Sequence, residues 1–443
     1  MARLKCALFL CAVLMLSGCA SPVFVPAGTP VYLEITEVPT SLTLLPSPSI
    51  APSFSPSKTV VPPSTPSPSP EPPKEAILGF VGDILMMETQ IKTAKTDSGY
   101  DFTRSFAPMQ TLFESVDLMC GNFEGAFAGE DAGYSKPRAT QEPPSELNPS
   151  PTIPPYQSFN APDALAYNLK TLGFDVLTTA NNHCLDRGYD GLCRTTEAIH
   201  EAGLFQTGTF SSEQARQEPL VIDMNGFKIG IVAATESVNS KDGLLKGDAR
   251  SFAVARLNDK EERVKSDIAA CHKEGAEFII VCAHWGDEFE NYPNSRQKRT
   301  ANKLIQWGAD AIIGSHPHVV QPIEYVEVER DSKSVKALVV WSLGNFISNM
   351  SPSPEDYGLF VRLTLARDEG GTAFLKETSY LPVLCAKQSL STGVRLHQTL
   401  PCYEDTSTVA AFEMPDEKLL EDVLKARKYV IKICGTDAAS LIG

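Results

Sequence analysis

The sequence has no Cys-x-x-Cys pair, although it contains 11 cysteines among 443 residues. Cysteines at that spacing build zinc ribbons and redox-active sites, so neither kind of site is indicated. Basic residues are also scarce, since 39 Lys and Arg stand against 54 Asp and Glu and the net charge is −15. A chain this acidic is a poor candidate for binding nucleic acid or an anionic membrane surface through charge.

Long apolar runs are missing beyond the first twenty residues, so no membrane-spanning helix is expected. At the start, two basic residues precede an apolar core over 6–16, which is too short to cross a bilayer. The Leu-Ser-Gly-Cys19 stretch that follows resembles the lipobox of bacterial lipoproteins. We expect a signal peptide over 1–18, lipid on Cys19 and a place on the extracytoplasmic face of the cell membrane. An ordinary secretory signal is the alternative.

Cleavage there would remove two basic residues and bring the net charge to −15 − 2 = −17. It would leave eight cysteines besides Cys19, and we expect most of them to be buried thiols. Residues 19–74 are rich in Pro and Ser, with 11 prolines in the 28 residues of 46–73. Such a segment cannot bury a core and favours extended polyproline II. At roughly 3.1 Å per residue, it could act as a spacer between the membrane and a domain.

Strands and helices alternate from residue 75 onward, which predicts an α/β domain over 75–390. Buried strands are predicted over 76–81, 116–120, 174–179, 276–282 and in the apolar run that ends at Gly314. Antiparallel strands are predicted over 219–223 with 227–233, 319–328 with 335–341, 357–365 and 372–384. Helices are predicted over 163–172, 189–202, 260–273, 295–307 and 416–434. The last helix belongs to a C-terminal extension, 391–443, that should pack on the domain.

Polar side chains follow six of the strands at their carboxyl ends. They are Asp83, Asn122 with Glu124, Asn182 with His183, His284, His316 with His318, and Asn345. Because the carboxyl ends of parallel strands meet at one edge of a sheet, these groups should converge. Carboxylate, amide and imidazole together suit a divalent metal such as Mn, Fe or Zn. Four of the seven histidines of the chain belong to this set.

These motifs resemble those of the CapA family, which is named for capsule and poly-γ-glutamate biosynthesis. The resemblance covers roughly residues 76–350. It rests on Gly82-Asp83, Asn122-Phe-Glu124, Ala-Asn-Asn-His183, His284-Trp-Gly, Gly314-Ser-His-Pro-His-Val319 and Ser342-Leu-Gly-Asn345-Phe. The family in turn looks like the calcineurin-like metallophosphatases. The resemblance therefore implies a four-layer α/β/β/α sandwich with a two-metal site built from strand-end loops.

The resemblance also implies roles for individual residues. The metal ligands would be Asp83, Asn122, Glu124, Asn182, His284, His316 and His318. Asn122 or Glu124 would supply the bridging or nearby ligand, and His183 would act as general acid. Trp285, Glu288 and Asn345 would contact the substrate. The chain departs from the phosphatases at Leu85, where they carry a His, and at Asn122, where they carry an Asp. These departures favour one metal, or a weak second one.

Three functions are compatible with this pattern. The first is a lipid-anchored, metal-dependent hydrolase or transferase that uses a metal-activated water on a cell-surface polymer such as poly-γ-glutamate. The second is a non-catalytic, membrane-anchored component of a machine that makes or exports the polymer. The third is a phosphoesterase, against which the departures at Leu85 and Asn122 count.

Overall fold

The structure is a computed structural model that describes residues 75–135, 158–258, 261–330, 332–389, 393, 395–406 and 416–442. The predicted signal peptide, Cys19 and the Pro-rich linker lie outside these residues. The chain divides into two compact units, Met1–Ser67 and Pro68–Gly443, and every described residue belongs to the second. In the described part of the chain, every helix is too short or too polar to cross a membrane.

A nine-stranded sheet, the first sheet, forms one half of the domain. Its main path is β16 (Arg395–Pro401), β15 (Ala373–Ser389), β14 (Tyr357–Arg367), β1 (Glu75–Ile84), β4 (Leu118–Phe123), β5 (Val176–Thr178) and β6 (Phe205–Thr207). β13 (Asn345–Ile347) pairs with β1, and β17 (Ser440–Leu441) pairs with β15. The pairs β1–β4, β4–β5 and β5–β6 are parallel, whereas β14, β15 and β16 are antiparallel to their neighbours on the main path. The sheet is therefore mixed, as the sequence predicts.

A six-stranded sheet, the second sheet, forms the other half. Its order is β11 (Ile323–Arg330), β12 (Lys333–Val340), β10 (Ala311–Ser315), β9 (Phe278–His284), β8 (Phe227–Thr235) and β7 (Leu220–Met224). The four central strands run parallel, and the two edge strands form antiparallel hairpins with their neighbours. A small third sheet pairs β2 (Lys95–Thr96) with β3 (Gly99–Tyr100).

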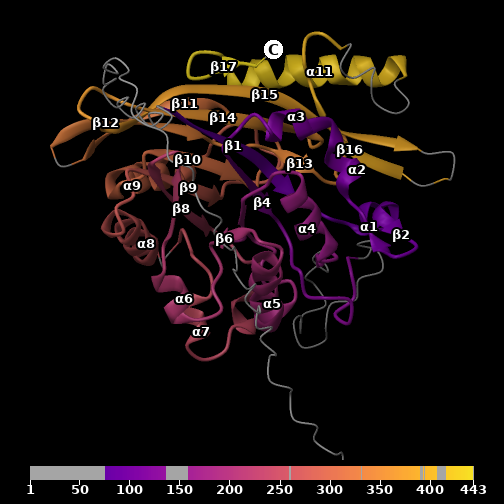
Figure 1. The fold of residues 1–443 in the computed structure, drawn as a ribbon, viewed down its shortest axis with the longest axis horizontal. Coiled ribbons are helices and arrows are strands. Elements are labelled where there is room, and N and C mark those ends of the chain that lie inside the picture. The colour runs from indigo at the N-terminus through magenta and orange to yellow at the C-terminus, as the bar shows by residue number, and fades with distance from the viewer. Residues whose placement is uncertain are drawn as a thin grey trace, which may run out of the picture. The chain divides into compact units, whose positions relative to one another are not determined.

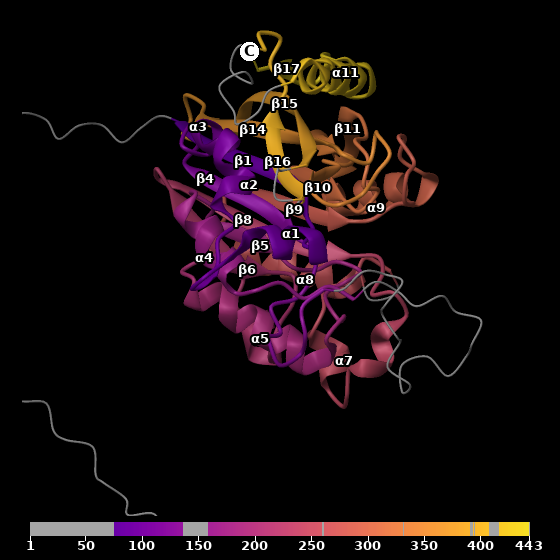
Figure 2. The same cartoon turned by 90° about the vertical axis from the view of Figure 1, so that its right-hand side faces the viewer.

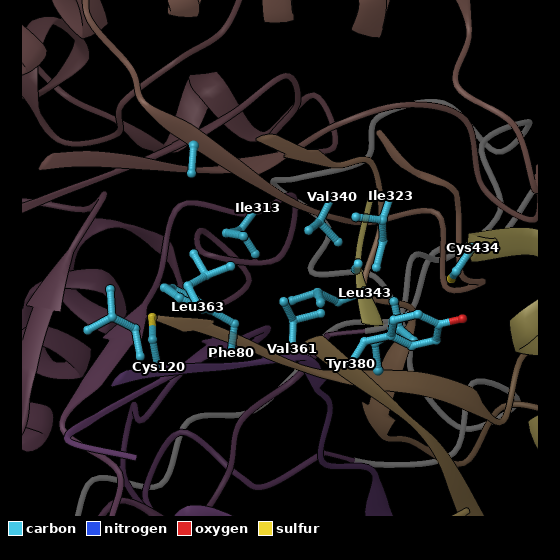
Figure 3. Packing of buried hydrophobic residues seen from close by; sticks show 14 of the residues in the cluster. Phe80, Cys120, Ile313, Ile323, Val340, Leu343, Val361, Leu363, Tyr380 and Cys434 are labelled. Atoms are coloured by element: carbon cyan, nitrogen blue, oxygen red, sulfur yellow. The ribbon is translucent and has the colours of Figure 1, made fainter. Parts of the chain in front are cut away.

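The main hydrophobic core lies between the two large sheets. Alternate residues of each strand point inward, because successive side chains of a strand face opposite ways. Phe80 and Val361 of the first sheet belong to the same buried cluster as Ile313 and Val340 of the second. Figure 3 shows these side chains meeting in the space between the two sets of strands.

Helices cover the outer face of each sheet (Figure 1). Over the first sheet, buried side chains of α4 (Ala164–Thr171) and α5 (Gly188–Glu201) pack with outward-facing residues such as Val81 and Leu177. Over the second sheet, α8 (Glu261–Lys273) and α9 (Ser295–Trp307) do the same. The described fold is a four-layer α/β/β/α sandwich, so the predicted fold class is confirmed.

The other helical segments that precede β16 are short. They are α1 (Glu88–Ala94), α2 (Thr103–Phe106), η1 (Ala107–Met109), α3 (Gln110–Phe113), α6 (Glu213–Gln217), η3 (Lys241–Leu244) and α7 (Ala249–Phe252). The first four connect β1 to β4, and the last two belong to the long connection between β8 and β9.

The C-terminal region is built into the domain rather than attached to it. β16 lies beyond the predicted boundary at 390, yet it hydrogen-bonds along β15 as the edge strand of the first sheet. Helix α11 (Glu417–Cys434) inserts Val423, Ala426 and Val430 into the main core. Figures 1 and 2 both place α11 alongside β15. Both β16 and α11 therefore pack with the strands that precede residue 390.

The eight cysteines downstream of Cys19 are all free thiols, and six of them are fully buried. Cys120 and Cys282 come from β4 and β9, one in each sheet, and both border the main core. Cys120 is buried as a small hydrophobic residue, as expected, whereas Cys282 is only partly buried against the core.

Candidate metal centre

Strand register brings the polar strand ends together. In the first sheet, Asp83 of β1 is aligned with Asn122 of β4 and with Asn345 of β13. In the second sheet, His284 of β9 is aligned with Ser315 of β10 on one side and Thr235 of β8 on the other. Hydrogen bonds and close contacts across the two sheets then join these two rows into one cluster of side chains.

The backbone packs closely at Gly82 and Gly314, two glycines near the carboxyl ends of β1 and β10. A Cβ atom at Gly82 would lie 1.9 Å from the carbonyl oxygen of Gly344, and one at Gly314 would lie 1.9 Å from that of Trp341. Both contacts are far inside van der Waals distance, so only glycine fits at either position. Gly82 immediately precedes Asp83, and Gly314 lies two residues before His316. The close packing at each glycine therefore helps to fix the position of the polar residue that follows.

Glu124 lies at the centre of the cluster. Its side chain is fully buried, and neither carboxylate oxygen has a hydrogen-bond partner among the described residues. Its Oε1 lies 3.9 Å from Nε2 of His183, 3.8 Å from Nε2 of His284 and 4.0 Å from Nε2 of His318. Burying a carboxylate without donors is costly, because the lost hydration is not replaced.

Each of these three histidines is held by its other ring nitrogen. Nδ1 of His183 bonds Oδ2 of Asp186 at 2.8 Å. Nδ1 of His284 bonds Oγ of Ser315 at 3.0 Å, and Nδ1 of His318 bonds Oδ1 of Asn345 at 3.1 Å. Metal-binding histidines usually have one nitrogen fixed by the protein in this way, which leaves the other directed at the ion.

Two asparagines link the acidic and imidazole groups. Asn122 donates Nδ2 to Oδ1 of Asp83 at 2.7 Å and lies 3.3 Å from Nδ1 of His284. Its Oδ1 accepts from the hydroxyl of Thr178 at 3.2 Å. Oδ1 of Asn182 lies 3.0 Å from Nε2 of His284. Asn122 therefore orients Asp83, whereas Asn182 presents an oxygen to the cluster.

The backbone of the His-Pro-His turn is strained. His316 and His318 have φ angles of 97° and 58°, a region that bulky residues rarely adopt. The backbone N–H of His316 points to Oδ2 of Asp83 at 3.4 Å, and that same oxygen lies 3.3 Å from Nδ1 of His318. The buried Nδ1 of His316 has no partner among the described residues. Such conformations cost about 1–3 kcal/mol each and concentrate at functional sites.

The environment gives these groups different proton affinities. Burial, with Asp83 adding to it, raises the pKa of Glu124 well above its usual range. Burial alone would lower the pKa of His318, but Glu124 and Asp83 outweigh it and raise that pKa to about 10. Burial and neighbouring imidazoles lower the pKa of His316 to about 3 and that of His284 well below its usual value. His284 and His316 are therefore neutral, the form in which imidazole binds a metal.

The residues fit a divalent metal. Two sets of ligand atoms lie within 4.8 Å of one another, namely Glu124, His316 and His318, and Asp83, Glu124 and His284. Ligands about 2.1 Å from one ion lie roughly 3–4 Å apart, which matches the distances around Glu124. An ion would also satisfy the two unpartnered carboxylate oxygens and the unpartnered Nδ1 of His316. Glu124 belongs to both sets, as a bridging carboxylate would.

His183 is held in place by the buried carboxylate of Asp186. Asp186 is fully buried at its carboxylate and pairs with Lys241 as well as with His183. It also accepts the backbone N–H of Phe159 at 2.6 Å, and the Phe159 ring lies 4.4 Å from the imidazole of His183. His183 and Lys241 lower the pKa of Asp186 despite its burial. The His183 ring is thus fixed with Nε2 facing Glu124.

The sequence around this site matches a known protein family. Residues 77–350, more than half of the chain, match the model of the family described as "Bacterial capsule synthesis protein PGA_cap". The chain belongs to this family. The predicted CapA resemblance is therefore confirmed, and every residue of the metal cluster lies within the matched range.

Two relatives of the PGA_cap chain carry related names. The chain is 26% identical over 360 residues to "Capsule biosynthesis protein CapA" of Bacillus anthracis, covering 80% of this chain and 78% of the relative. It is 28% identical over 269 residues to "PGA biosynthesis protein CapA" of Bacillus subtilis, covering 60% and 62%. Among solved structures, it is similar to purple acid phosphatase PPD1 from yellow lupin seeds at 12% identity and a TM-score of 0.32, covering 79% and 58%.

Three residues of the PGA_cap domain do not lie where the sequence analysis expected. The side chain of Trp285 is fully buried, donates to the carbonyl of Trp341 at 3.0 Å and belongs to the core under α8 and α9. Asn345 is also fully buried and bonds His318 rather than facing substrate. Asn122 turns its amide nitrogen, not its oxygen, toward Asp83. We therefore correct Trp285 to a core residue, and Asn345 and Asn122 to residues that orient ligands.

Two further positions singled out in the sequence are Glu288 and Leu85. Glu288 is exposed on the loop that follows His284, and its charge raises the pKa of both Glu124 and His318. Leu85 is buried and donates its backbone N–H to Ile347, so it supplies no ligand. In the described part of the family domain, neither candidate ligand set contains a residue that replaces the missing histidine.

Sequence reasoning missed four polar residues at the site. Asp186 and Ser315 each bond a histidine, Lys241 bonds Asp186, and Glu236 borders the cluster next to His284. Ser315 and Glu236 could have been found, because both stand at or just after the ends of parallel strands. Lys241 could not, since it reaches Asp186 from a connection 55 residues away.

Proposed function

We propose that this chain is a metal-dependent hydrolase or transferase that acts in the synthesis of a capsule-type surface polymer such as poly-γ-glutamate. Membership of the PGA_cap family and the names of its relatives support the biological role. The observation that carries the chemistry is Glu124: its two buried oxygens lack donors, and three imidazole nitrogens lie 3.8–4.0 Å from its Oε1.

Five side chains and an amide would hold the ion. They are Asp83, Glu124, His284, His316, His318 and Asn182. A divalent ion bound there supplies Lewis-acid activation of water and of the scissile group. Because these ligands combine carboxylate and imidazole and include no thiolate, Mn, Fe or Zn suits them best.

The remaining residues of the site prepare the chemistry around the ion. His183 would give a proton to the leaving group from Nε2, since its Nδ1 is tied to Asp186. Lys241 keeps Asp186 ionised and in place. Asn122 and Asn345 hold Asp83 and His318 at the angles that binding requires.

We further propose that lipid on Cys19 anchors the chain to the outer face of the membrane, with residues 19–74 as a spacer. The lipobox-like sequence supports this proposal. Radiolabelled palmitate should be incorporated into the wild-type chain in its host and not into C19A. Labelling of C19A to the wild-type level would contradict the anchor.

Metal content of the purified full-length chain tests the proposed centre. Elemental analysis after dialysis against micromolar Mn, Fe or Zn should find at least one ion per wild-type chain. H284A and H316A should lose it, because each removes a ligand. H200A is the matched control, since His200 is exposed on α5 and remote in sequence from every ligand. If the wild-type chain binds no ion, or if H284A and H316A retain it fully, the proposal is wrong.

A second candidate function is a non-catalytic component of the polymer machine, in which the metal is structural. The specific observation in its favour is Leu85, a buried apolar residue where the metallophosphatase resemblance requires a histidine. H183N separates the two functions, because it removes the proton donor and spares the ligands. An enzyme should lose polymer production in this variant while it retains its metal. A structural component should support polymer production as well as the wild type does.

A further inference from the structure

A cavity of about 320 Å³ lies beside the metal cluster. His284 and His316 line it on the side of the cluster, and Glu236, Ser237 and Arg296 are among the residues that line the rest. Because two proposed metal ligands form part of its wall, anything bound in the cavity lies next to the ion. The volume is at the lower end of the range for small-molecule sites, so it suits one unit of a polymer rather than several.

Glu236 stands in the cavity wall with spare capacity to accept hydrogen bonds. It follows the last residue of β8, and its backbone N–H bonds the carbonyl of His284 at 3.0 Å. Its Oε2 accepts from the backbone N–H of Gly286 and from Nε of Arg296, both at 3.0 Å. Its Oε1 is buried and has no partner among the described residues. A carboxylate offers about four acceptor positions, and Glu236 uses two.

Arg296 is the only other charged residue among the described residues that line the cavity, and two carboxylates bond its guanidinium. Its Nε bonds Glu236, and its Nη2 bonds Oδ1 of Asp287 at 3.1 Å. Asn294 caps α9 through the backbone N–H of Arg296 and also bonds Asp287. No described residue bonds Nη1, and about half of the side chain is exposed. The cavity therefore offers a positioned cationic donor beside an anionic acceptor.

We propose that this cavity is a substrate subsite that binds a residue carrying an amide N–H next to a carboxylate, as in a chain of acidic amino acids. The carboxylate accepts from Nη1 of Arg296, and the N–H donates to Glu236. Arg296 and Glu236 determine specificity and bind no metal. This assignment rests on the proposed function, because it places the scissile bond of the same substrate at the metal cluster.

The charge pattern favours this class over simpler ligands. A lone anion such as phosphate would lie close to the carboxylate of Glu236, and a lone amine would lie close to the guanidinium of Arg296. A residue that carries both groups matches both partners. Charge-assisted hydrogen bonds are about twice as strong as neutral ones, so the pair can discriminate between ligands of similar size.

The experiment uses the purified full-length chain loaded with Mn²⁺ and the probe N-acetyl-L-glutamate, which has an amide N–H next to its α-carboxylate. Titration calorimetry should show binding to the wild type. R296Q and E236Q should each weaken that binding roughly tenfold or more, since each removes one charge-assisted hydrogen bond. R296K tests whether the planar guanidinium of Arg296 is needed, because lysine keeps the positive charge but lacks the paired N–H donors of arginine. R299Q is the matched control, being an exposed arginine three residues further along the same helix.

Metal content measured on the same samples separates the two proposals. If the wild type binds no metal, the proposed function fails first. If metal is retained in every variant but R296Q binds the probe as well as R299Q does, the subsite assignment is overturned. Binding of inorganic phosphate without binding of N-acetyl-L-glutamate would also overturn it. Retained metal with selective loss of the probe in R296Q and E236Q supports it.

Discussion

At the scale of single residues, Glu124 destabilises the folded chain on its own but is well placed to bind a metal ion. Its carboxylate is desolvated and unpaired, and burial raises its pKa. An apolar side chain would stabilise the fold better at this position, because an unpaired buried polar group lowers the free energy of unfolding by about 1–3 kcal/mol. The position makes physical sense when an ion compensates the charge.

We expect E124Q to abolish the stabilisation that metal gives. In the wild type, an ion at one hundred times its Kd should add about 2.7 kcal/mol to the free energy of unfolding. For a domain of this size, that raises the melting temperature by roughly 3 °C. Thermal unfolding of E124Q should show no rise on adding metal. Without metal, E124Q should be at least as stable as the wild type, since it removes a buried carboxyl group whose oxygens have no hydrogen-bond donors.

E288Q serves as the control for this prediction. Glu288 is a carboxylate of the same neighbourhood but is exposed to solvent. Its variant should keep nearly the full rise in melting temperature. An E124Q chain that responds to metal as strongly as E288Q does would show that Glu124 is no ligand.

At the scale of secondary-structure elements, the strand-end pattern predicted the cluster because it depends on topology alone. Parallel strands deliver their carboxyl ends to one edge, whatever the side chains between them. Apolar runs and capping residues were equally informative, so α9 begins at Ser295 and ends at Trp307 as the sequence predicts. Gly308 stops the helix and Asn294 caps it.

The direction in which a residue points could not be predicted in the same way. His284 and Trp285 are neighbours at the end of β9, yet one faces the cluster and the other the core. Asn345 begins β13, whose pairing with β1 decides what the side chain meets. The roles of Trp285 and Asn345 depend on contacts that only the folded chain defines.

Strand β16 was missed because its residues do not alternate in polarity. His397, Gln398 and Thr399 are polar, yet each is at least 96% buried. Apart from Nδ1 of His397, these groups have partners distant in the sequence, such as Ser105, whose carbonyl accepts from the hydroxyl of Thr399 at 3.2 Å. Hydrophobic pattern alone cannot identify such a strand.

His397 should make stability depend on pH. Its Nε2 bonds Oδ1 of Asn349 at 2.8 Å, and its buried Nδ1 has no partner among the described residues. Burial, with Lys387 adding to it, lowers its pKa to about 4. Between that value and about 6.5, the unfolded chain binds a proton that the folded chain does not. The free energy of unfolding therefore falls as pH drops through this window.

The measurement is urea unfolding at pH 7 and pH 4.5 for the wild type and H397Q. Glutamine can keep a donor for Asn349 but does not titrate. The loss of stability between the two pH values should be about 2 kcal/mol smaller in H397Q than in the wild type. H200Q, with an exposed histidine, should behave as the wild type does. Equal losses in the wild type and H397Q would refute the assignment.

At the scale of the whole folded unit, helix α11 completes the core between the sheets. It covers residues of β14 and β15 that the second sheet leaves uncovered, including Tyr380, which donates to the carbonyl of Gly435 at 2.8 Å. The helix also reaches the loop after His284, since Tyr429 donates to Oδ1 of Asn291 at 2.6 Å. The C-terminal region thus supports both the core and the surroundings of the metal cluster.

Two adjacent residues of α11 allow a matched test of this role. Val423 is fully buried in the core, whereas Leu424 is 45% exposed. V423A removes two buried methyl groups and leaves a cavity, so it should lower the free energy of unfolding by about 2 kcal/mol. L424A should change it by less than about 0.5 kcal/mol, as surface substitutions usually do. Urea unfolding measures the free energy of unfolding of both variants.

If α11 were a loosely attached extension, V423A would lower the free energy of unfolding no more than L424A does, and metal-dependent stabilisation would survive truncation after residue 406. We expect that truncation instead to unfold the domain, because it would expose the buried residues of β14 and β15 that α11 covers, such as Tyr380.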